Sequence, residues 1–309
     1  MNEIVVVGSM NVDIALRAAK IPSPGETVRA SDVQLGPGGK GLNQAIAAAR
    51  LGAEVRMVGR VGEDRLADVP LAALNDAGVD TSRVESSRDR ATGTAVIVID
   101  EASGQNAIAV AGGANGLLSP AQVAKAAPAF AAAKVLLVQL EAPPETVQAA
   151  LDLACEHGLV RILDPAPYRP LADELLADVD VLTPNESEAS QLAELDVCDV
   201  ESAVRAGEKL RSRVGGDIVI TLGQLGCVWL SGNDVVHIRA PQIEAMDTTG
   251  AGDAFNGALA YGLASGEPMR DALERAVVAG SVSTLRAGAA ASMPTPEDLA
   301  PYFPRPAAK

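Results

Sequence analysis

Short runs of β-branched residues alternate with longer Ala- and Leu-rich stretches along most of this chain, and no other feature constrains the fold as strongly. Strands are predicted over residues 4–7, 135–138, 161–163, 179–182 and 218–222. Helices are predicted over residues 42–51, 121–132, 145–157, 200–213, 254–264 and 269–285. This alternation is typical of a parallel sheet covered by helices.

Two segments interrupt the alternation, because residues 26–35 and 92–99 have strand character without an accompanying helix. The second continues through a turn at 101–104 into residues 106–110, which predicts a β-hairpin. We expect a small antiparallel flap standing off the main sheet, with its strands inserted at about 14–37 and 91–112. Such a sheet needs a cover for its apolar face, either the cleft below it or a second subunit.

Length and composition narrow the class of protein. A chain of 309 residues predicts one large domain, 1–309, with the flap as its elaboration. Lys and Arg total 25 against 40 Asp and Glu, and the net charge of −15 argues against nucleic acid and anionic membranes as partners. The three cysteines are widely spaced, and we find no signal peptide or transmembrane run, so we expect a cytoplasmic protein.

Polar residues follow several predicted strands closely. Asn11 and Asp13 come after the first strand, Gln139 and Glu141 after the second, Asp164 after the third, and Asn185 with Glu188 after the fourth. Ligands of open α/β sheets bind beyond the carboxyl ends of the strands. We therefore expect these side chains to line a cleft there.

The segment 247–253, DTTGAGD, runs directly into an apolar stretch with helical character. Its glycines leave backbone N–H groups uncovered at a helix start, which attracts anions. Asp253 lies within this anion site, and two interpretations are open for it. It could cap the helix, or it could act as a base beside a bound phosphate and accept a proton from an attacking hydroxyl.

A second glycine-rich turn, GPGGKGLNQ at 36–44, also enters a helix. A P-loop is excluded, because Gln34 replaces its first glycine and Gly41 replaces its Ser or Thr. The first strand does not lead into GxGxxG, which excludes a dinucleotide fingerprint. The alternatives left are a structural turn, or backbone amides and Asn43 facing a polyhydroxylated ligand.

Four separated motifs together resemble the ribokinase/PfkB family of carbohydrate kinases over nearly the whole chain. They are GSMNVD at 8–13, GGKGLNQA at 38–45, TPNESE at 183–188, and 247–253 with FNG at 255–257. The first two favour the ribokinase branch. The resemblance implies a three-layer α/β/α sandwich with a mostly parallel central sheet and a small β-sheet lid that pairs two subunits into a homodimer.

The resemblance also implies the roles of the sugar-site residues in an ATP-dependent transfer to the 5-hydroxyl of D-ribose, a step of ribose catabolism. The sugar hydroxyls would be held by Asn11, Asp13, Gly39, Lys40, Asn43 and Glu141. Asp253 would be the general base, and the amides of Gly250, Ala251 and Gly252 would form an anion hole. From the residues alone, the alternative for Asp13 is a structural role, either as a helix cap or in an ion pair within a loop.

The remaining sites follow from the same resemblance. The nucleotide would contact Asn185, Gly252 and the turn Thr221, Leu222, Gly223, Gln224, Leu225 and Gly226. Asn185 and Glu188 would position Mg²⁺ through water, although a capping Asn with a first-turn Glu is an equal alternative. A potassium ion would be bound by Asp247, Thr249, Ser283, Arg286, Gly288 and Ser292, several through their carbonyls.

The chain departs from the family pattern at three positions. Val277 stands where a His near the nucleotide is frequent, Leu42 replaces a smaller Ala, and Met10 lies inside the sugar turn. These departures leave other acceptors open: deoxyribose, a nucleoside, fructose or a keto-sugar acid. A non-catalytic sugar or nucleotide sensor on the same fold is a further alternative, disfavoured by Asp253 and its two glycines.

Overall fold

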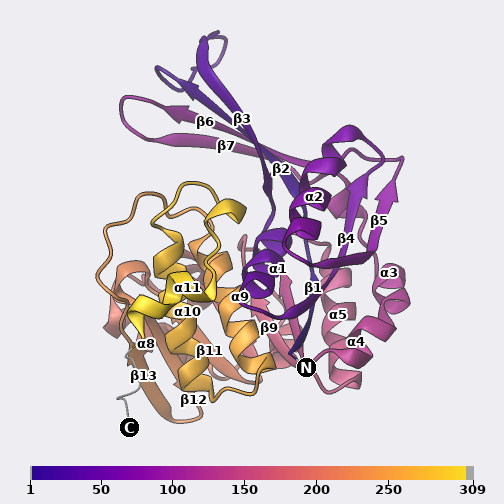
Figure 1. Ribbon diagram of the computed structural model, residues 1–309. Coiled ribbons are helices and arrows are strands. Elements are labelled where there is room, and N and C mark those ends of the chain that lie inside the picture. The colour runs from indigo at the N-terminus through magenta and orange to yellow at the C-terminus, as the bar shows by residue number, and fades with distance from the viewer. Residues whose placement is uncertain (1, 304–309) are drawn as a thin grey trace.

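The structure is a computed structural model that describes residues 2–303, so position 1 and positions 304–309 of the expected domain lie outside the described residues. A nine-stranded sheet lies between two layers of helices, and a separate four-stranded sheet stands above it as a lid (Figure 1). The predicted α/β sandwich with a mostly parallel sheet and a β lid is confirmed.

The main sheet has the strand order β13-β12-β11-β10-β9-β8-β1-β4-β5. All neighbours from β11 to β5 are parallel, and β12 and β13 are antiparallel additions at one edge. The strands are β1 (Glu3–Val7), β4 (Glu54–Gly62), β5 (Asp80–Ser87), β8 (Val135–Gln139), β9 (Val160–Asp164), β10 (Val181–Leu182), β11 (Asp217–Thr221), β12 (Cys227–Ser231) and β13 (Asp234–Ile238).

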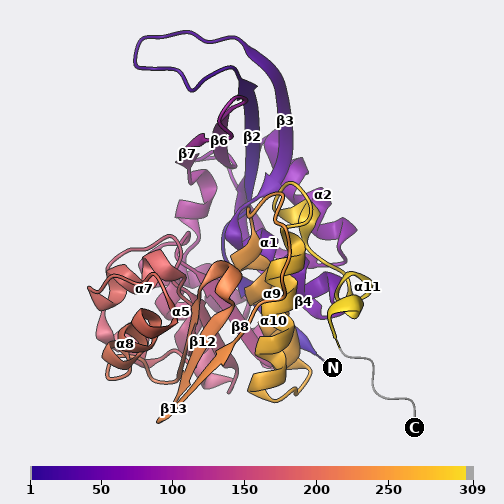
Figure 2. The same cartoon turned by 90° about the vertical axis from the view of Figure 1, so that its left-hand side faces the viewer.

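Helices cover both faces of this sheet, because successive strand residues point to opposite faces and both sets are apolar. Ile4 and Val6 belong to the core under α1, α2, α9 and α10, whereas Val5 and Val7 belong to the core under α3 to α8 (Figure 2). The helices are α1 (Lys40–Arg50), α2 (Asp68–Asp76), α3 (Pro120–Lys125), α4 (Ala127–Ala132), α5 (Pro144–Glu156), α6 (Asp173–Ala177), α7 (Glu186–Ala193), α8 (Val200–Leu210), α9 (Ala251–Ala264), α10 (Met269–Ser283) and α11 (Pro296–Leu299).

The lid consists of β2 (Asn11–Ala18), β3 (Ala30–Gly38), β6 (Gly93–Asp100) and β7 (Asn106–Ala111), in the order β3-β2-β6-β7. The expectation of a purely antiparallel flap was wrong, since the central pair β2 and β6 is parallel. The reason lies in the main sheet: β2 follows β1 and β6 follows β5, and these strands all point the same way. Both lid strands therefore leave the carboxyl edge of the sheet in one direction.

Four strands of the main sheet were missing from the predicted ranges: β4, β5 and the antiparallel pair β12 and β13. β4 carries Arg56 and Arg60, and β5 carries Asp80, Arg83 and Glu85, so neither shows a continuous apolar run. β5 is the edge strand, where charged side chains reach solvent and protect the edge.

Among the described residues, no helix combines the length and the apolar character needed to cross a bilayer.

Candidate active site

The candidate site lies at the carboxyl edge of the main sheet, where the N-termini of α1 and α9 converge under the lid (Figure 1). The two helices touch closely: a Cβ on Gly257 of α9 would come within 2.7 Å of the Gln44 carbonyl oxygen on α1. A Cβ on Gly41, at the start of α1, would likewise lie 2.7 Å from the Gly8 carbonyl carbon and the Ser9 nitrogen. These contacts bring together residues that are more than 200 positions apart in the chain.

Asn11 and Asp13 are not in a turn, as the motif suggested, but on the first lid strand, β2. Asn11 Oδ1 accepts a hydrogen bond of 2.7 Å from Asn115 Nδ2, and Gly93 leaves the space for it. The carboxyl group of Asp13 lies against Gly38, where any Cβ would be 2.2–2.3 Å from its atoms. Gly93 and Gly38 therefore leave the space that the side chains of Asn11 and Asp13 occupy.

Glu141 lies in the loop after β8, and its carboxylate bonds to the N-terminus of α1. Its Oε2 accepts from the backbone N–H of Lys40 at 3.1 Å and from the Ser9 hydroxyl. The first turn of α1 contains no acidic residue of its own, so this carboxylate supplies a negative charge at the positive end of the helix. Gly39, the N-cap of α1, has φ of 94°, a conformation that favours glycine.

Asp253 does not cap helix α9, whose N-cap is Gly250 without a side-chain cap. The side chain is buried and turned toward α1 instead. Its Oδ2 accepts from Asn43 Nδ2 at 2.8 Å, and its Oδ1 accepts from Gln44 Nε2 at 3.0 Å. The capping interpretation is therefore wrong for Asp253, and both of its oxygens are oriented by amides of consecutive residues.

Asn43 has a second polar atom without a protein partner. Its Oδ1 is buried and accepts no hydrogen bond, while its Nδ2 is occupied by Asp253. A buried acceptor without a donor is costly unless a ligand supplies one. This atom marks the place where a hydroxyl group of a bound molecule would complete the site.

The site concentrates negative charge around one lysine. Burial, together with Glu141 and Asp253, raises the pKa of Asp13 to about 6. Burial by itself would lower the pKa of Lys40, but Asp253, Asp164, Glu141 and Glu188 together raise it above its usual value. Lys40 therefore stays charged and partly balances the carboxylates.

The glycine-rich segment before α9 adopts the turn that its sequence suggested. Gly250 has a left-handed φ of 79°, and a Cβ there would press on Ala289 at 3.0 Å. A Cβ on Gly252 would meet no atom within 4 Å, so its backbone faces open space. The Ala251 N–H donates to the Thr248 carbonyl at 3.2 Å, so this one of the three amides already has an acceptor.

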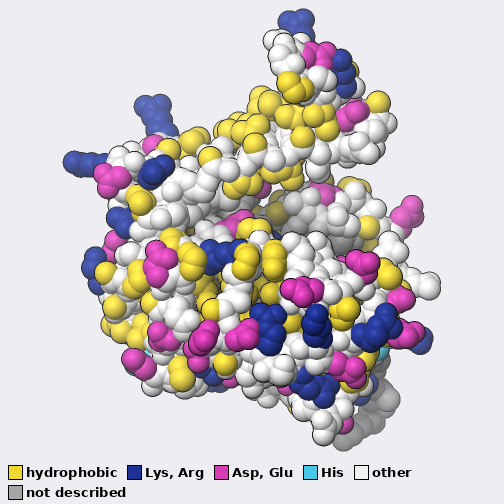
Figure 3. Space-filling view, turned by 180° about the vertical axis from the view of Figure 1, so that it is seen from behind, with side chains coloured by type: hydrophobic (Ala, Val, Ile, Leu, Met, Phe, Trp, Pro, Cys, Tyr) yellow, Lys and Arg dark blue, Asp and Glu magenta, His cyan; other side chains and the backbone are white. Residues whose placement is uncertain are grey.

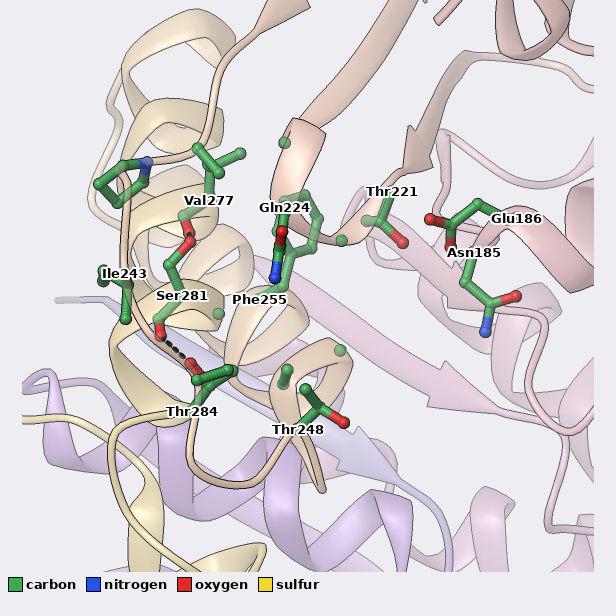
Figure 4. A pocket seen from close by; sticks show the side chains of 18 residues that line it. Asn185, Glu186, Thr221, Gln224, Ile243, Thr248, Phe255, Val277, Ser281 and Thr284 are labelled. Atoms are coloured by element: carbon green, nitrogen blue, oxygen red, sulfur yellow. Dashed lines mark hydrogen bonds between the residues drawn. The ribbon is translucent and has the colours of Figure 1, made fainter. Parts of the chain in front are cut away.

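A cavity of about 420 Å³ opens beside this helix start (Figure 4). Of the residues expected around a nucleotide, it is lined by Asn185, Thr221, Gly223, Gln224, Gly226 and Gly252. Leu222 is buried and Leu225 is exposed, and neither lines the cavity. The far wall comes from Val277, which the resemblance had placed near the nucleotide, and from Ile243, Ser281 and Thr284, which no motif indicated.

Asn185 and Glu188 form a reciprocal capping box at the start of α7. Asn185 Oδ1 accepts from the Glu188 N–H at 2.9 Å, and Glu188 Oε2 accepts from the Asn185 N–H at 2.9 Å. The alternative of a capping Asn185 with Glu188 in the first turn of the helix is therefore present in the structure. The capping box does not use Asn185 Nδ2 or Glu188 Oε1. Within residues 2–303, no group of three or more His, Cys, Asp or Glu could hold a metal ion by itself.

Asp247 organises the loop that precedes the glycine segment. Its carboxylate accepts from the N–H and hydroxyl of Thr249 at 2.9 and 2.6 Å, and from the Gly288 N–H at 2.8 Å. Ser283 and Ser292 are buried and donate their hydroxyls to the carbonyls of Gly280 and Ala289. The side chain of Arg286 pairs with Asp298, so only its backbone could contribute to an ion site.

Five buried polar residues of the site had no role assigned from the sequence. They are Ser9, Gln44, Asn115, Gln139 and Asp164, although Gln139 and Asp164 were expected to line the cleft because each follows a predicted strand. Gln44 is internal to α1, where a polar residue carries no signal of its own. Asp164 does follow a strand, and burial first, then Asp253 and Glu188, raises its pKa to about 8 against the opposing effect of Lys40.

Comparisons with known proteins show the family to which the chain belongs. A model of the pfkB family carbohydrate kinases matches residues 1–296. The chain is 40% identical to a ribokinase of Bacillus subtilis over 300 residues, covering 97% of this chain and 98% of that protein. It is 34% identical to a deoxyribokinase of Salmonella typhi over 302 residues, covering 97% and 98%. The structure of Arabidopsis thaliana ribokinase complexed with ribose and ATP superimposes with a TM-score of 0.91 at 32% identity, covering 96% and 97%.

Proposed function

Because this chain belongs to the pfkB family of carbohydrate kinases, we propose that it transfers the γ-phosphate of ATP to the 5-hydroxyl of D-ribose. The observation that carries the proposal is the placement of Asp253. It is buried, held through both oxygens by Asn43 and Gln44, and lies in the first turn of α9. Asp253 also lies close enough to Asp13 on the lid strand to contribute, after burial and Glu141, to the rise of the pKa of Asp13.

The sugar would occupy the space between β2 and the start of α1. The residues proposed to contact it there are Asn11, Asp13, Gly39, Lys40, Asn43 and Glu141, which lie on β2, at the start of α1 and in the loop after β8. Carboxylates and amides accept from, or donate to, vicinal hydroxyls in fixed geometry. The unpartnered Asn43 Oδ1 supports this use, because it needs a donor that only a ligand or water can supply.

Asp253 would accept the proton of the primary hydroxyl while that oxygen forms its bond to the γ-phosphorus and the bond to ADP breaks. Burial raises the pKa of Asp253, against the opposing effects of Lys40, Asn43 and Gln44, which makes it a stronger base than an exposed carboxylate. The free amides of Gly250 and Gly252, at the positive end of α9, would stabilise the phosphoryl oxygens. The cavity lined by Thr221, Gln224 and Val277 would hold the nucleoside.

Asn185 and Glu188 are too few to hold Mg²⁺ by themselves, so they fit an ion that is bound largely by the substrate. Glu188 keeps one carboxylate oxygen beyond its capping box, and Asn185 keeps its second side-chain atom. Mg²⁺ commonly uses one or two carboxylates, several waters and phosphate oxygens. When bound with ATP, it neutralises phosphate charge, and this chain's part is to hold its water shell through Asn185 and Glu188.

Activation by potassium is expected from the loop that Asp247 organises. Oxygen atoms of Asp247, Thr249, Ser283, Arg286, Gly288 and Ser292 would hold the ion, and such ligands suit a hard cation. The ion would order the segment that ends in Gly250. We expect kcat to rise several-fold when K⁺ replaces Na⁺ at constant ionic strength, in line with the effect of ordering an anion site. Equal initial rates in the two salts would contradict the assignment.

Sugar affinity should depend on pH through Asp13, whose pKa is raised to about 6. Only the ionised carboxylate accepts hydrogen bonds through both oxygens, so affinity should be constant above pH 7. It should fall by up to about tenfold per pH unit below 6. Calorimetric titration of the sugar between pH 5 and 8 measures this. The Asp13→Asn variant should bind more weakly at pH 8 but with a flatter profile, and an unchanged slope would contradict the role.

We also propose that two copies pair through the lid. Register places Ile14, Leu16, Val33 and Leu35 on the face opposite to Asp13. Val33 and Leu35 are 53% and 58% exposed, and Figure 3 shows apolar side chains along the lid above a hollow. Exposed apolar strands of this kind are usually covered by a partner. A light-scattering mass of one chain at micromolar concentration would contradict pairing.

The test of the proposed function is an ADP-release assay with ATP over D-ribose, deoxyribose, fructose, keto-sugar acids and nucleosides. We expect the highest kcat/KM for D-ribose, with the product identified as the 5-phosphate by phosphorus NMR. The Salmonella typhi relative makes deoxyribose the most informative competitor. A kcat/KM for deoxyribose or a nucleoside that exceeds that of ribose would overturn the assignment of the sugar.

A further inference from the structure

Gln44 is a buried residue of α1 whose side-chain amide has every polar atom engaged. Its Nε2 donates to Asp253 Oδ1 at 3.0 Å and to Asp164 Oδ2 at 2.7 Å. Its Oε1 accepts from Gln139 Nε2 at 2.6 Å. Two donors and one acceptor in fixed directions leave the amide a single orientation. The side chain is thus held as firmly as a backbone group.

The residues around Gln44 are placed by the main sheet itself. Gln139 ends β8 and Asp164 ends β9, and the two are direct partners in the register of these strands. Gly8 leaves the space for Gln139, because a Cβ there would be 2.1 Å from Gln139 Oε1. Gly257 permits α9 to approach α1 next to Gln44. Four elements therefore converge on one amide group.

From this geometry we infer that Gln44 is a positioning residue for the base Asp253, and that Asp164 and Gln139 fix Gln44 for that task. Asn43 holds one oxygen of Asp253 and Gln44 holds the other, so rotation of the carboxylate about its last bond breaks both contacts. A base that is misplaced by about 1 Å can lose roughly 10²-fold in rate. The inference rests on the proposed function, since it needs Asp253 to act as the base.

Asp164 has a second consequence for the base. Burial contributes most to the rise of its pKa to about 8, so its ionised form is disfavoured in the folded protein. A protonated Asp164 still accepts from Gln44 through Oδ2 and adds no further negative charge near Asp253. The charged groups that act on it are Lys40, which opposes the rise, and Asp253 and Glu188, which promote it.

The test is Gln44→Met, which keeps the length of the side chain and removes its donors. At saturating sugar and ATP we expect kcat to fall about 10- to 100-fold, while both KM values change by less than about threefold. The acid limb of the kcat–pH profile should move to higher pH, because Asp253 loses a hydrogen bond that favours its ionised form. An unchanged kcat and an unchanged acid limb would overturn the inference.

A matched control separates positioning from packing. Gln122 on α3 is also a buried glutamine, and its Nε2 donates to the Gly59 carbonyl at 2.7 Å, away from Asp253. Gln122→Met should lose thermal stability like Gln44→Met but keep the acid limb of wild type. If both variants lower kcat equally without moving the limb, Gln44 has only a packing role.

Two further comparisons test the network. In the double variant Gln44→Met with Asp253→Asn, kcat should equal that of Asp253→Asn alone, because a positioning residue has nothing to position once the base is gone. Asp164→Asn retains an acceptor for Gln44, so its kcat should exceed that of Asp164→Leu at least about threefold. Additive losses, or equal rates for the two Asp164 variants, would contradict the network.

The wild-type assay distinguishes this inference from the proposed function. If wild type releases no ADP with any sugar of the panel, the proposed function fails. If wild type is active and Asp253→Asn is inactive, but Gln44→Met behaves as wild type, only the inference about Gln44 fails.

Discussion

Replacing Asp253 by Asn should lower kcat by roughly 10²–10⁴ while leaving the binding of sugar and ATP nearly unchanged. The amide cannot accept the proton of the attacking hydroxyl, but it has nearly the shape of the carboxylate. One conflict arises, because Asp253 accepts from both Asn43 and Gln44 and an amide presents one donor to them. Asn43 can resolve it by turning its free Oδ1 toward that donor; its Nδ2 then faces the sugar hydroxyl, which can accept a hydrogen bond as well as donate one. Initial rates with calorimetric binding of each substrate measure the effect.

The control for this variant is its stability. Because the pKa of Asp253 is raised, its ionised form is disfavoured in the folded protein, and its contribution to stability declines as the pH rises through that pKa. At pH 7.5 the Asp253→Asn variant should therefore unfold at the same temperature as wild type or above it. More than a tenth of wild-type kcat, in a variant that melts normally, would remove Asp253 from the chemistry.

Gly41→Ala should have the second-largest effect, through displacement of α1. The added Cβ would lie 2.7 Å from the Gly8 carbonyl carbon and the Ser9 nitrogen, and 2.8 Å from the Gly8 Cα. All three are backbone atoms between β1 and β2 and cannot rotate away. The helix start must move, and the Lys40 N–H would leave Glu141. We expect the sugar KM to rise at least about tenfold and stability to fall by about 1–3 kcal/mol.

Gly116→Ala is the matched change for comparison, because a Cβ there would meet nothing within 4 Å. It should stay within about 0.5 kcal/mol of wild type in denaturant unfolding, with an unchanged sugar KM. If Gly41→Ala also binds the sugar as wild type does, the close contact between α1 and the turn 8–10 does not shape the sugar site.

Much of the fold followed from local patterns. The apolar runs that became β1, β8, β9 and β11 are buried on both faces, and such strands have a strong sequence signal. The edge strand β5 has no such signal, because its charged residues reach solvent. The predicted helix 121–132 is divided at Ala126 into α3 and α4. Pro128 carried the signal for this break, because proline is tolerated only in the first turn of a helix, which is where it lies in α4.

The site was predictable where a motif combined glycine with a polar residue. Gly250 and Gly39 have the left-handed backbone that their motifs imply, and Asp253 lies beside Asn43 as the resemblance to the family suggested. The capping box of Asn185 and Glu188 was equally visible as a local alternative. Position 277 was expected near the nucleotide from the resemblance, but Ser281 and Thr284 were not: their spacing puts them on the same helix face as Val277, and only the packing of α10 beside α9 turns that face toward the cavity.

The amino-acid sequence by itself determined the class of fold, the glycine turns and the identity of the acidic residue at the start of α9, because each depends on neighbours within a few positions. Only the tertiary structure decided which amides hold that residue. Gln44, Gln139, Asp164 and Asp253 come from four elements, and they meet because β8 and β9 pair in register while α1 and α9 touch at Gly257. Hydrogen bonds of this kind depend on distances across the core, which no local pattern of residues contains.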